Sequence, residues 1–138
     1  IRMEQQKFQA VLLKKLEILG RICANAATQS RFIHRRETTG LRRLLREQAR
    51  LMDELAGIDR ELKGSGDRVI PAVLRPIMQE IEIKQEQIAA LSQQALEDAV
   101  KERNNLMAEL NHVRIMRRLK NRYESRTGIG GSRLNLKG

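Results

Sequence analysis

The sequence predicts an all-α protein, folded as an elongated antiparallel helical hairpin or small helical bundle with coiled-coil-like packing. Apolar residues recur at steps of 3 and 4 along most of the 138 residues, which is the period of a packed helix. Aromatic residues make up only 2% of the chain, and Trp is absent. Such a composition suits a narrow aliphatic seam between helices better than the core of a compact α/β domain.

The first predicted helix covers about residues 4–36. Its apolar seam has heptad spacing and consists of Leu12, Leu16, Leu19, Cys23, Ala26, Ser30 and Ile33. A second row widens this stripe and consists of Val11, Lys15, Ile18 and Ile22. A stripe of that width is typical of a helix in a bundle. Gly20 lies off the seam, and we expect it to permit close approach of a neighbouring helix.

The second predicted helix covers about residues 41–63. Its seam consists of Leu41, Leu44, Gln48, Leu51, Leu55, Ile58 and Leu62. Joining it to the first seam takes two consecutive steps of 4, through Ile33, Glu37 and Leu41. A continuous helix absorbs such a stutter by local unwinding, so one kinked helix and two separate helices both fit. Thr38, Thr39 and Gly40 favour a break or kink at 37–40.

The third predicted helix covers about residues 72–125 and follows a turn at 64–70. The turn is indicated by Gly64-Ser65-Gly66-Asp67, and proline at 71 and 76 requires the helix to begin nearby. We therefore expect one helical domain over 1–126 and a flexible glycine-containing tail over 127–138. If the turn is the tip of the hairpin, the numbers of two residues that face each other across the arms add up to about 134, because both arms rise equally per residue. That pairing brings residues 31–36 to 97–102, and residues 14–21 to the basic residues 114–122.

No catalytic, metal or cofactor site is predicted. His34 and His112 have no partner at metal-ligand spacing, and Cys23 has no visible base beside it. The glycines near the C-terminus follow a helix, whereas a phosphate-binding loop joins a strand to a helix. We therefore expect a binding protein and not an enzyme. No apolar run has the length of a membrane span, so no membrane insertion is expected.

The formal net charge of +10 favours acidic partners. Arginine dominates two clusters, one over residues 31–50 and one over residues 114–126. Each cluster is also explained as a solvated helix face. Nucleic-acid binding is the less favoured hypothesis, because the clusters lack interleaved aromatic residues and a known reading motif.

The candidate partner-binding face lies near the end of the third helix. Its apolar residues are Leu106, Leu110, Val113, Met116, Leu119 and Tyr123. A basic rim accompanies them and consists of Arg114, Arg117, Arg118 and Arg122. Capture of a partner helix is one use of such a face, and burial of it in a homodimer is the alternative.

The run LLKKLEILGRICANAATQSRFIHRRETTGLRRLLREQARLMDELAGIDREL resembles the flagellar export chaperones of the FlgN type. The likeness rests on an amphipathic first helix, on the leucine spacing of residues 41–55, and on a long Asn-, Gln- and Arg-rich helix ending in Tyr123. It covers roughly residues 5–131. One departure is the charge, because secretion chaperones are commonly acidic and this chain is at +10.

The resemblance implies a cytoplasmic chaperone of type III flagellar export. Such a chaperone binds the C-terminal helical region of hook–filament junction proteins, prevents their premature polymerisation, and delivers them to the export apparatus and its ATPase complex. In that family the C-terminal helix binds cargo, and the six apolar residues from Leu106 to Tyr123 match it here. The alternatives are a basic structural coiled-coil stalk or adaptor and, less favoured, a nucleic-acid-associated helical protein.

Overall fold

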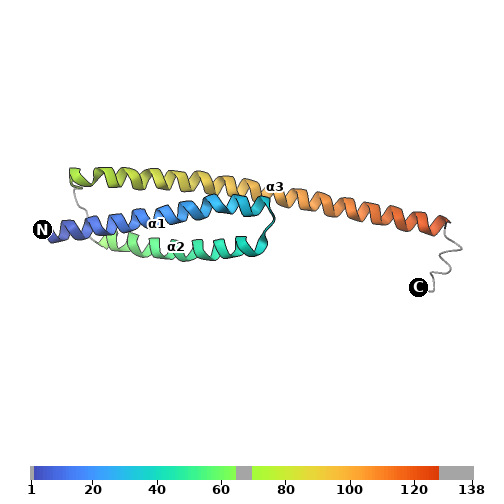
Figure 1. The fold of residues 1–138 in the computed structure, drawn as a ribbon, viewed down its shortest axis with the longest axis horizontal. Helices are drawn as coiled ribbons and strands as arrows, with labels where there is room; N and C mark the ends of the chain where they lie inside the picture. The colour runs from blue at the N-terminus through green and yellow to red at the C-terminus, as the bar shows by residue number, and fades with distance from the viewer. Residues whose placement is uncertain (1, 65–69, 128–138) are drawn as a thin grey trace. The chain divides into compact units, whose positions relative to one another are not determined.

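The computed structural model describes the backbone of residues 2–64 and 70–127 and the side chains of residues 5–64 and 70–125. Its elements are α1 (Arg2–His34), α2 (Thr38–Gly64), a 3₁₀ turn η1 (Ala72–Leu74) and α3 (Arg75–Thr127) (Figure 1). The prediction of an all-α fold is confirmed, since these described ranges contain helices and no strand. Residues 65–69 of the predicted turn and 128–138 of the predicted tail lie outside them.

Contacts divide the chain into two compact units, Ile1–Ala99 and Val100–Gly138, where the sequence suggested one domain over 1–126. The first unit holds α1, α2, η1 and the beginning of α3. The described part of the second unit is the remainder of α3. The predicted helices end within a few residues of the observed ones. The main difference from the prediction is that the chain reverses direction between α1 and α2.

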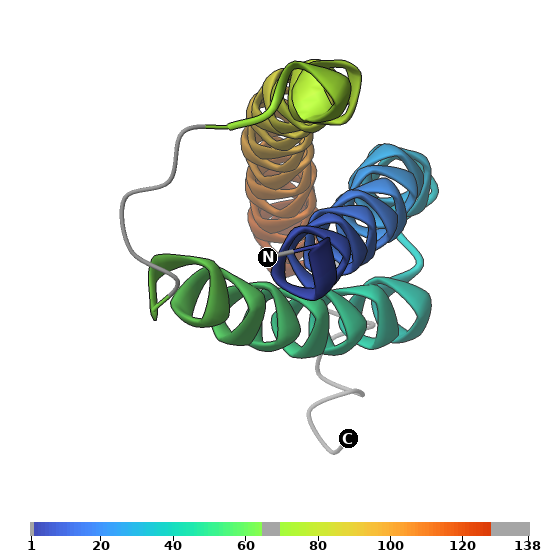
Figure 2. The same cartoon turned by 90° about the vertical axis from the view of Figure 1, so that its left-hand side faces the viewer.

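In the first unit, α2 runs antiparallel to α1, and α3 runs parallel to α1 (Figures 1 and 2). The Lys15 ammonium lies 2.8 Å from the Asp59 carboxylate, and Asn25 donates a hydrogen bond to the carbonyl of Leu44 at 2.9 Å. Residue numbers therefore fall along α2 as they rise along α1. Between α1 and α3 the numbers rise together, because Cys23 contacts Gln87 and His34 contacts Asp98.

The expected pairing of residues that sum to about 134 is therefore wrong. It treated α1 and α2 as one continuous arm, whereas the chain reverses between them and α2 pairs with α1 itself. Lys15 consequently lies beside Asp59 of α2. The His34–Asp98 pair still falls in the expected region, because the parallel and antiparallel registers coincide there.

The two rows of residues on α1 face different neighbours. Leu12 and Leu19, from the heptad seam, pack with Leu74 of η1 and with Ile81 near the start of α3. The second row packs against α2, where Ile22 joins the cluster that contains Leu51 and Ile58. Leu55, Leu62 and Ile88 touch both clusters, so the first unit has one continuous apolar core.

Near the turn, the α1–α2 seam becomes polar. Asn25 and Gln29 are buried, and the Gln29 side-chain amide donates to Asn25 Oδ1 at 2.8 Å and to Gln48 Oε1 at 2.7 Å. Asn25 Nδ2 also lies 3.2 Å from Glu47 Oε1. Among the described residues, no buried side-chain nitrogen or oxygen lacks a hydrogen-bond partner, so this polar layer is satisfied.

The sequence left a kink or a break open at 37–40, and the structure has a break at Arg35–Glu37. The Arg36 N–H donates to the Ile33 carbonyl at 3.1 Å and the Glu37 N–H to the Phe32 carbonyl at 3.0 Å. These are the two hydrogen bonds of a Schellman helix end. That motif needs a residue with positive φ, and Arg36 supplies it with a φ of 57° where glycine is usual.

Gly40 lies inside the first turn of α2, and the ring of Phe32 occupies the space where a side chain would be. A Cβ built on Gly40 would lie 2.7 Å from Phe32 Cε2. Gly20 was expected to permit a close helix approach, but a Cβ there would meet nothing within 4 Å. The close approach therefore occurs at the turn between α1 and α2, through Gly40.

Alanine substitutions at these two glycines should change stability in opposite directions. Gly20→Ala should raise the free energy of unfolding by about 0.5–1 kcal/mol, because alanine is the better helix former and the added methyl group has room. Gly40→Ala gains the same propensity but displaces the Phe32 ring, and we expect a net loss of about 1 kcal/mol. Urea unfolding followed by circular dichroism would measure both, and equal stabilisation by both would contradict the ring contact.

The start of α3 is set by two prolines. The Leu74 N–H donates to the Pro71 carbonyl at 3.0 Å, which forms η1, and Pro76 occupies the first turn of α3, where a missing N–H has little cost. The turn places Leu74 fully inside the core, at 0% exposure. The end of α1 is fixed to α3 by His34 Nε2, which lies 3.4 Å from Oδ2 of the buried Asp98.

Candidate interaction surface

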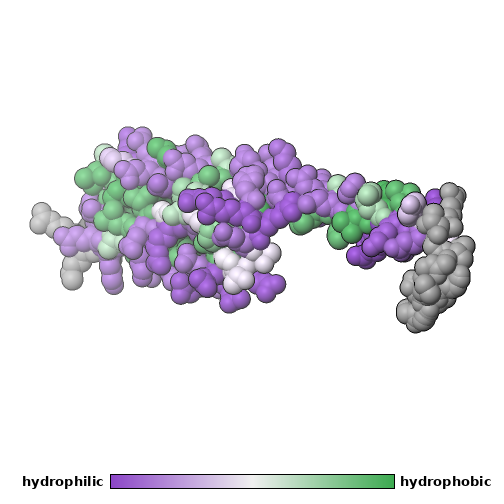
Figure 3. Space-filling view, turned by 45° about the vertical axis from the view of Figure 1, so that its right-hand side comes forward, coloured by the Kyte–Doolittle hydropathy of each residue, from purple (hydrophilic) through white to green (hydrophobic). Residues whose placement is uncertain are grey.

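The described residues of the second unit present their apolar side chains to solvent. Every described side chain from Arg103 to Ser125 is exposed, whereas the seam residues of α3 in the first unit are buried or half-buried. The six predicted binding residues range from 43% exposed at Leu106 to 68% at Tyr123. Figure 3 shows hydrophobic side chains on the surface of this part of α3. Their number makes this segment the candidate interaction surface.

Helix geometry divides the six predicted residues into two groups. Leu106, Leu110 and Val113 fall within an arc of about 60°, since each residue turns the helix by about 100°. From Leu110 to Leu119 the predicted apolar residues recur at steps of 3 and not 4. Each such step rotates the stripe backward by about 60°, so Met116 and Leu119 move progressively around the helix. We call Leu106, Leu110 and Val113 the first patch.

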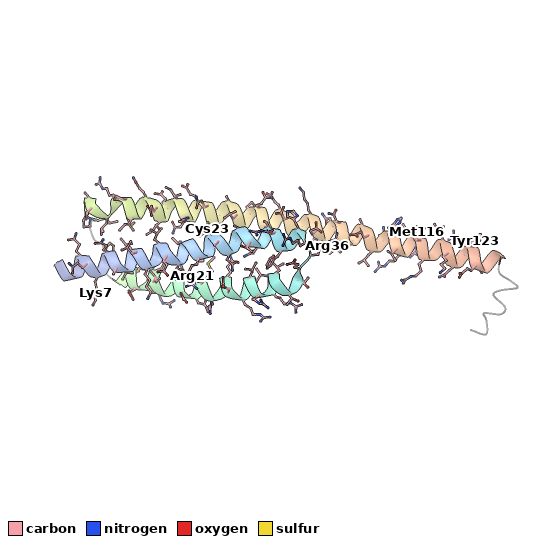
Figure 4. All side chains as sticks on the ribbon, viewed as in Figure 1. Lys7, Arg21, Cys23, Arg36, Met116 and Tyr123 are labelled. Carbon is pink, nitrogen blue, oxygen red and sulfur yellow. The ribbon has the colours of Figure 1, made fainter. Side chains whose placement is uncertain are left out.

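A second patch lies on another side of the same helix. It consists of Ile115, Met116, Leu119 and Tyr123, which fall within an arc of about 100° centred about 140° from the first patch. Figure 4 labels Met116 and Tyr123 on this part of α3. Ile115 is 46% exposed and was missed by the sequence analysis, because it lies off the heptad positions used there. Its position one turn before Leu119 was the available signal.

Basic side chains lie around the part of the α3 surface that the second patch does not occupy. They are Arg114, Arg117, Arg118, Lys120 and Arg122, and we call them the basic arc. Lys120 and Arg122 border the second patch on its two sides, and the three other arginines lie farther round the helix. All five side chains are exposed. Of the predicted basic rim, only Arg122 therefore borders the second patch, and Arg117 continues the stripe of the first patch.

The described residues contain no group of three or more His, Cys, Asp or Glu side chains placed to hold a metal ion. Cys23 is half-buried and its thiol lies 3.8 Å from Gln87 Oε1. None of α1, α2 and α3, over their described residues, is apolar for long enough to cross a bilayer.

Comparison with protein-family models, with curated proteins and with solved structures found no match to this chain.

Proposed function

We propose that this protein is a flagellar type III export chaperone that works in the cytoplasm without catalysis. Its cargo in this proposal is the C-terminal helical region of hook–filament junction proteins, which it keeps unpolymerised and delivers to the export apparatus and its ATPase complex. The observation that carries the proposal is the first patch. Three large aliphatic side chains there share one side of a helix, and all are exposed, whereas the apolar seams of the first unit are covered.

The different burial of apolar residues in the two units supports this function. The first unit buries its own apolar residues in one core and so supplies a folded base. The second unit has no second helix among its described residues to cover Leu106, Leu110 and Val113. An amphipathic helix from another protein covers such a stripe by packing side chains at positions i, i+3, i+4 and i+7 against it. Covering the apolar face of the cargo in the same contact prevents that face from polymerising.

A basic structural stalk or adaptor is the competing proposal. A stalk uses its helices as a rigid spacer and has no need for exposed aliphatic side chains, which carry a risk of aggregation. A homodimer through the first patch would also cover these residues, and its concentration dependence separates it from cargo binding.

The test is calorimetric titration of the whole chain with C-terminal helical segments of hook–filament junction proteins from the same organism. One-to-one binding is expected, and Leu110→Asp should raise the Kd at least about 30-fold, because a charge in the centre of an apolar interface is left desolvated. Ile83→Asp is the matched control, since Ile83 is on α3 and 52% exposed, against 55% for Leu110. It should leave the Kd unchanged.

Other results would favour the alternatives. A heat of binding seen only with duplex DNA, and lost as the salt concentration rises, would contradict the chaperone proposal. It would favour a nucleic-acid-associated protein. A sedimentation coefficient that rises with protein concentration in the unchanged chain, but not in Leu110→Asp, would assign the first patch to a homodimer. Absence of binding to either titrant by a monomer would leave the stalk or adaptor.

A further inference from the structure

We propose that the second patch, together with the basic arc, is a docking site for the anionic surface of a lipid bilayer. This goes beyond the cargo-binding function, which uses the first patch. The helix would lie in the plane of the membrane interface, with the second patch turned toward the acyl chains and the basic arc among the headgroups.

The distribution of side chains around residues 114–123 meets the requirements of an interfacial helix. One side carries Ile115, Met116, Leu119 and the single tyrosine of the chain, and the other side carries the five side chains of the basic arc. Helices that lie on membranes combine an apolar face of this kind with a polar face rich in Lys and Arg. Lys120 and Arg122 border the apolar side, where long basic side chains can keep their charges in the headgroup layer while their stems cover apolar surface.

The charge in this segment has one sign. No acidic residue occurs between Glu109 and Glu124, so the five basic side chains act together. Clusters of four to eight Lys and Arg residues on an amphipathic helix are typical of binding to anionic lipids. The partner of this segment is therefore strongly acidic over an area, and not at one point.

The placement of the basic arc favours a bilayer over an acidic helix as that partner. A partner helix packed on the second patch would reach Lys120 and Arg122 at its edges, but Arg114, Arg117 and Arg118 would point away from it. The potential of an anionic surface decays over a Debye length of about 8 Å at physiological salt, which is comparable with the width of one helix. All five charges then contribute to attraction by a bilayer.

The two patches can be occupied together. Their centres are about 140° apart around the helix, so a cargo helix on the first patch leaves most of the second patch uncovered. Loaded and empty protein should therefore both dock on a bilayer. A membrane-bound state of this kind would hold cargo at the surface through which exported proteins must pass.

The experiment is flotation of the full chain with vesicles of phosphatidylcholine alone or with about 30% phosphatidylglycerol, an anionic lipid chosen for its surface charge. Binding is expected only with the anionic vesicles. Leu119→Asp should lower the partition coefficient at least about tenfold, because it places a charge in the apolar face. The control is again Ile83→Asp, an exposed position on α3 outside the second patch, which should bind as the unchanged chain does.

Tyr123 supplies a second readout, because the chain contains one Tyr and no Trp. Its fluorescence should be quenched by nitroxide groups on the upper acyl chain of the lipid, which shows burial of the apolar face in the interface. Two results would overturn the proposal. One is vesicle binding that Leu119→Asp leaves intact and that leaves Tyr123 unquenched, which would show attraction of basic side chains alone. The other is no vesicle binding while an acidic amphipathic peptide binds and is released by Leu119→Asp, which would assign the patch to a protein partner.

Discussion

Replacing Leu51 with alanine should lower the free energy of unfolding by about 3 kcal/mol. Leu51 lies on α2 with 0% exposure and is packed among Ile18, Ile22 and Ile58. Removal of three buried carbons loses their transfer free energy and also leaves a cavity that stiff β-branched neighbours fill poorly. Because the site is in the core of the first unit, the loss should appear in the unfolding of that unit.

The measurement is urea unfolding of the variant against the unchanged chain, with the slope m compared as well as the midpoint. Leu45→Ala is the matched control, since Leu45 is on the same helix but 48% exposed. Its effect should stay within about 1 kcal/mol, because little surface leaves a buried environment and alanine favours the helix. Equal losses for the two variants would mean that α2 does not use Leu51 as a core residue.

Replacing Asn25 with leucine should lower the free energy of unfolding by about 2 kcal/mol, although the position is buried and the new side chain is apolar. Asn25 Nδ2 donates to the Leu44 carbonyl, and Asn25 Oδ1 accepts from Gln29 Nε2. The leucine removes both bonds and the contact with Glu47, and it leaves the Gln29 amide with Gln48 Oε1 as its acceptor. Burial of a polar group that has lost a hydrogen bond costs more than the added apolar contact returns.

A double-mutant cycle separates this network from ordinary packing. Asn25→Leu with Gln29→Leu removes both members of the pair, so the double variant should lose clearly less than the two single losses added together. Strict additivity would mean that the two amides do not act as a unit. A large coupling energy would mean that the polar layer contributes to stability as a unit, across the contacts that join α1 to Leu44 and Gln48.

The helices could be predicted from the sequence because apolar spacing is a local signal, and the all-α fold followed directly. The seams of α1 and α2 also proved to be the buried or half-buried faces, from Leu12 to Ile33 and from Leu41 to Leu62. The arrangement of the helices was missed because the second row of α1 was treated as a widening of the first. That row continues at heptad spacing through Asn25 and Gln29, whose polar side chains conceal it. A helix with two complete seams needs two neighbours.

Two other features could not have been found from apolar spacing. Arg36 has positive φ because the backbone hydrogen bonds of the helix end require it, and arginine shows no preference for that conformation. Leu74 is fully buried from a non-periodic segment between two prolines. For the interaction surface, the sequence indicated the apolar residues but left open whether their face is free or buried in a dimer. The division into two patches follows from the steps of 3 after Leu110.

The antiparallel pairing of α1 with α2 has a consequence for the order of folding. These helices are joined by a turn of a few residues, so their contacts close short loops, whereas Cys23 meets Gln87 and His34 meets Asp98 only across 64 residues. Local contacts form faster than distant ones, and a chain made on the ribosome emerges from its N-terminal end. The α1–α2 hairpin should therefore form on the growing chain before α3 is available to pack against it. Until residues 74–98 have left the exit tunnel, the side of α1 that carries Leu12 and Leu19 is a transient target for aggregation and for general folding factors.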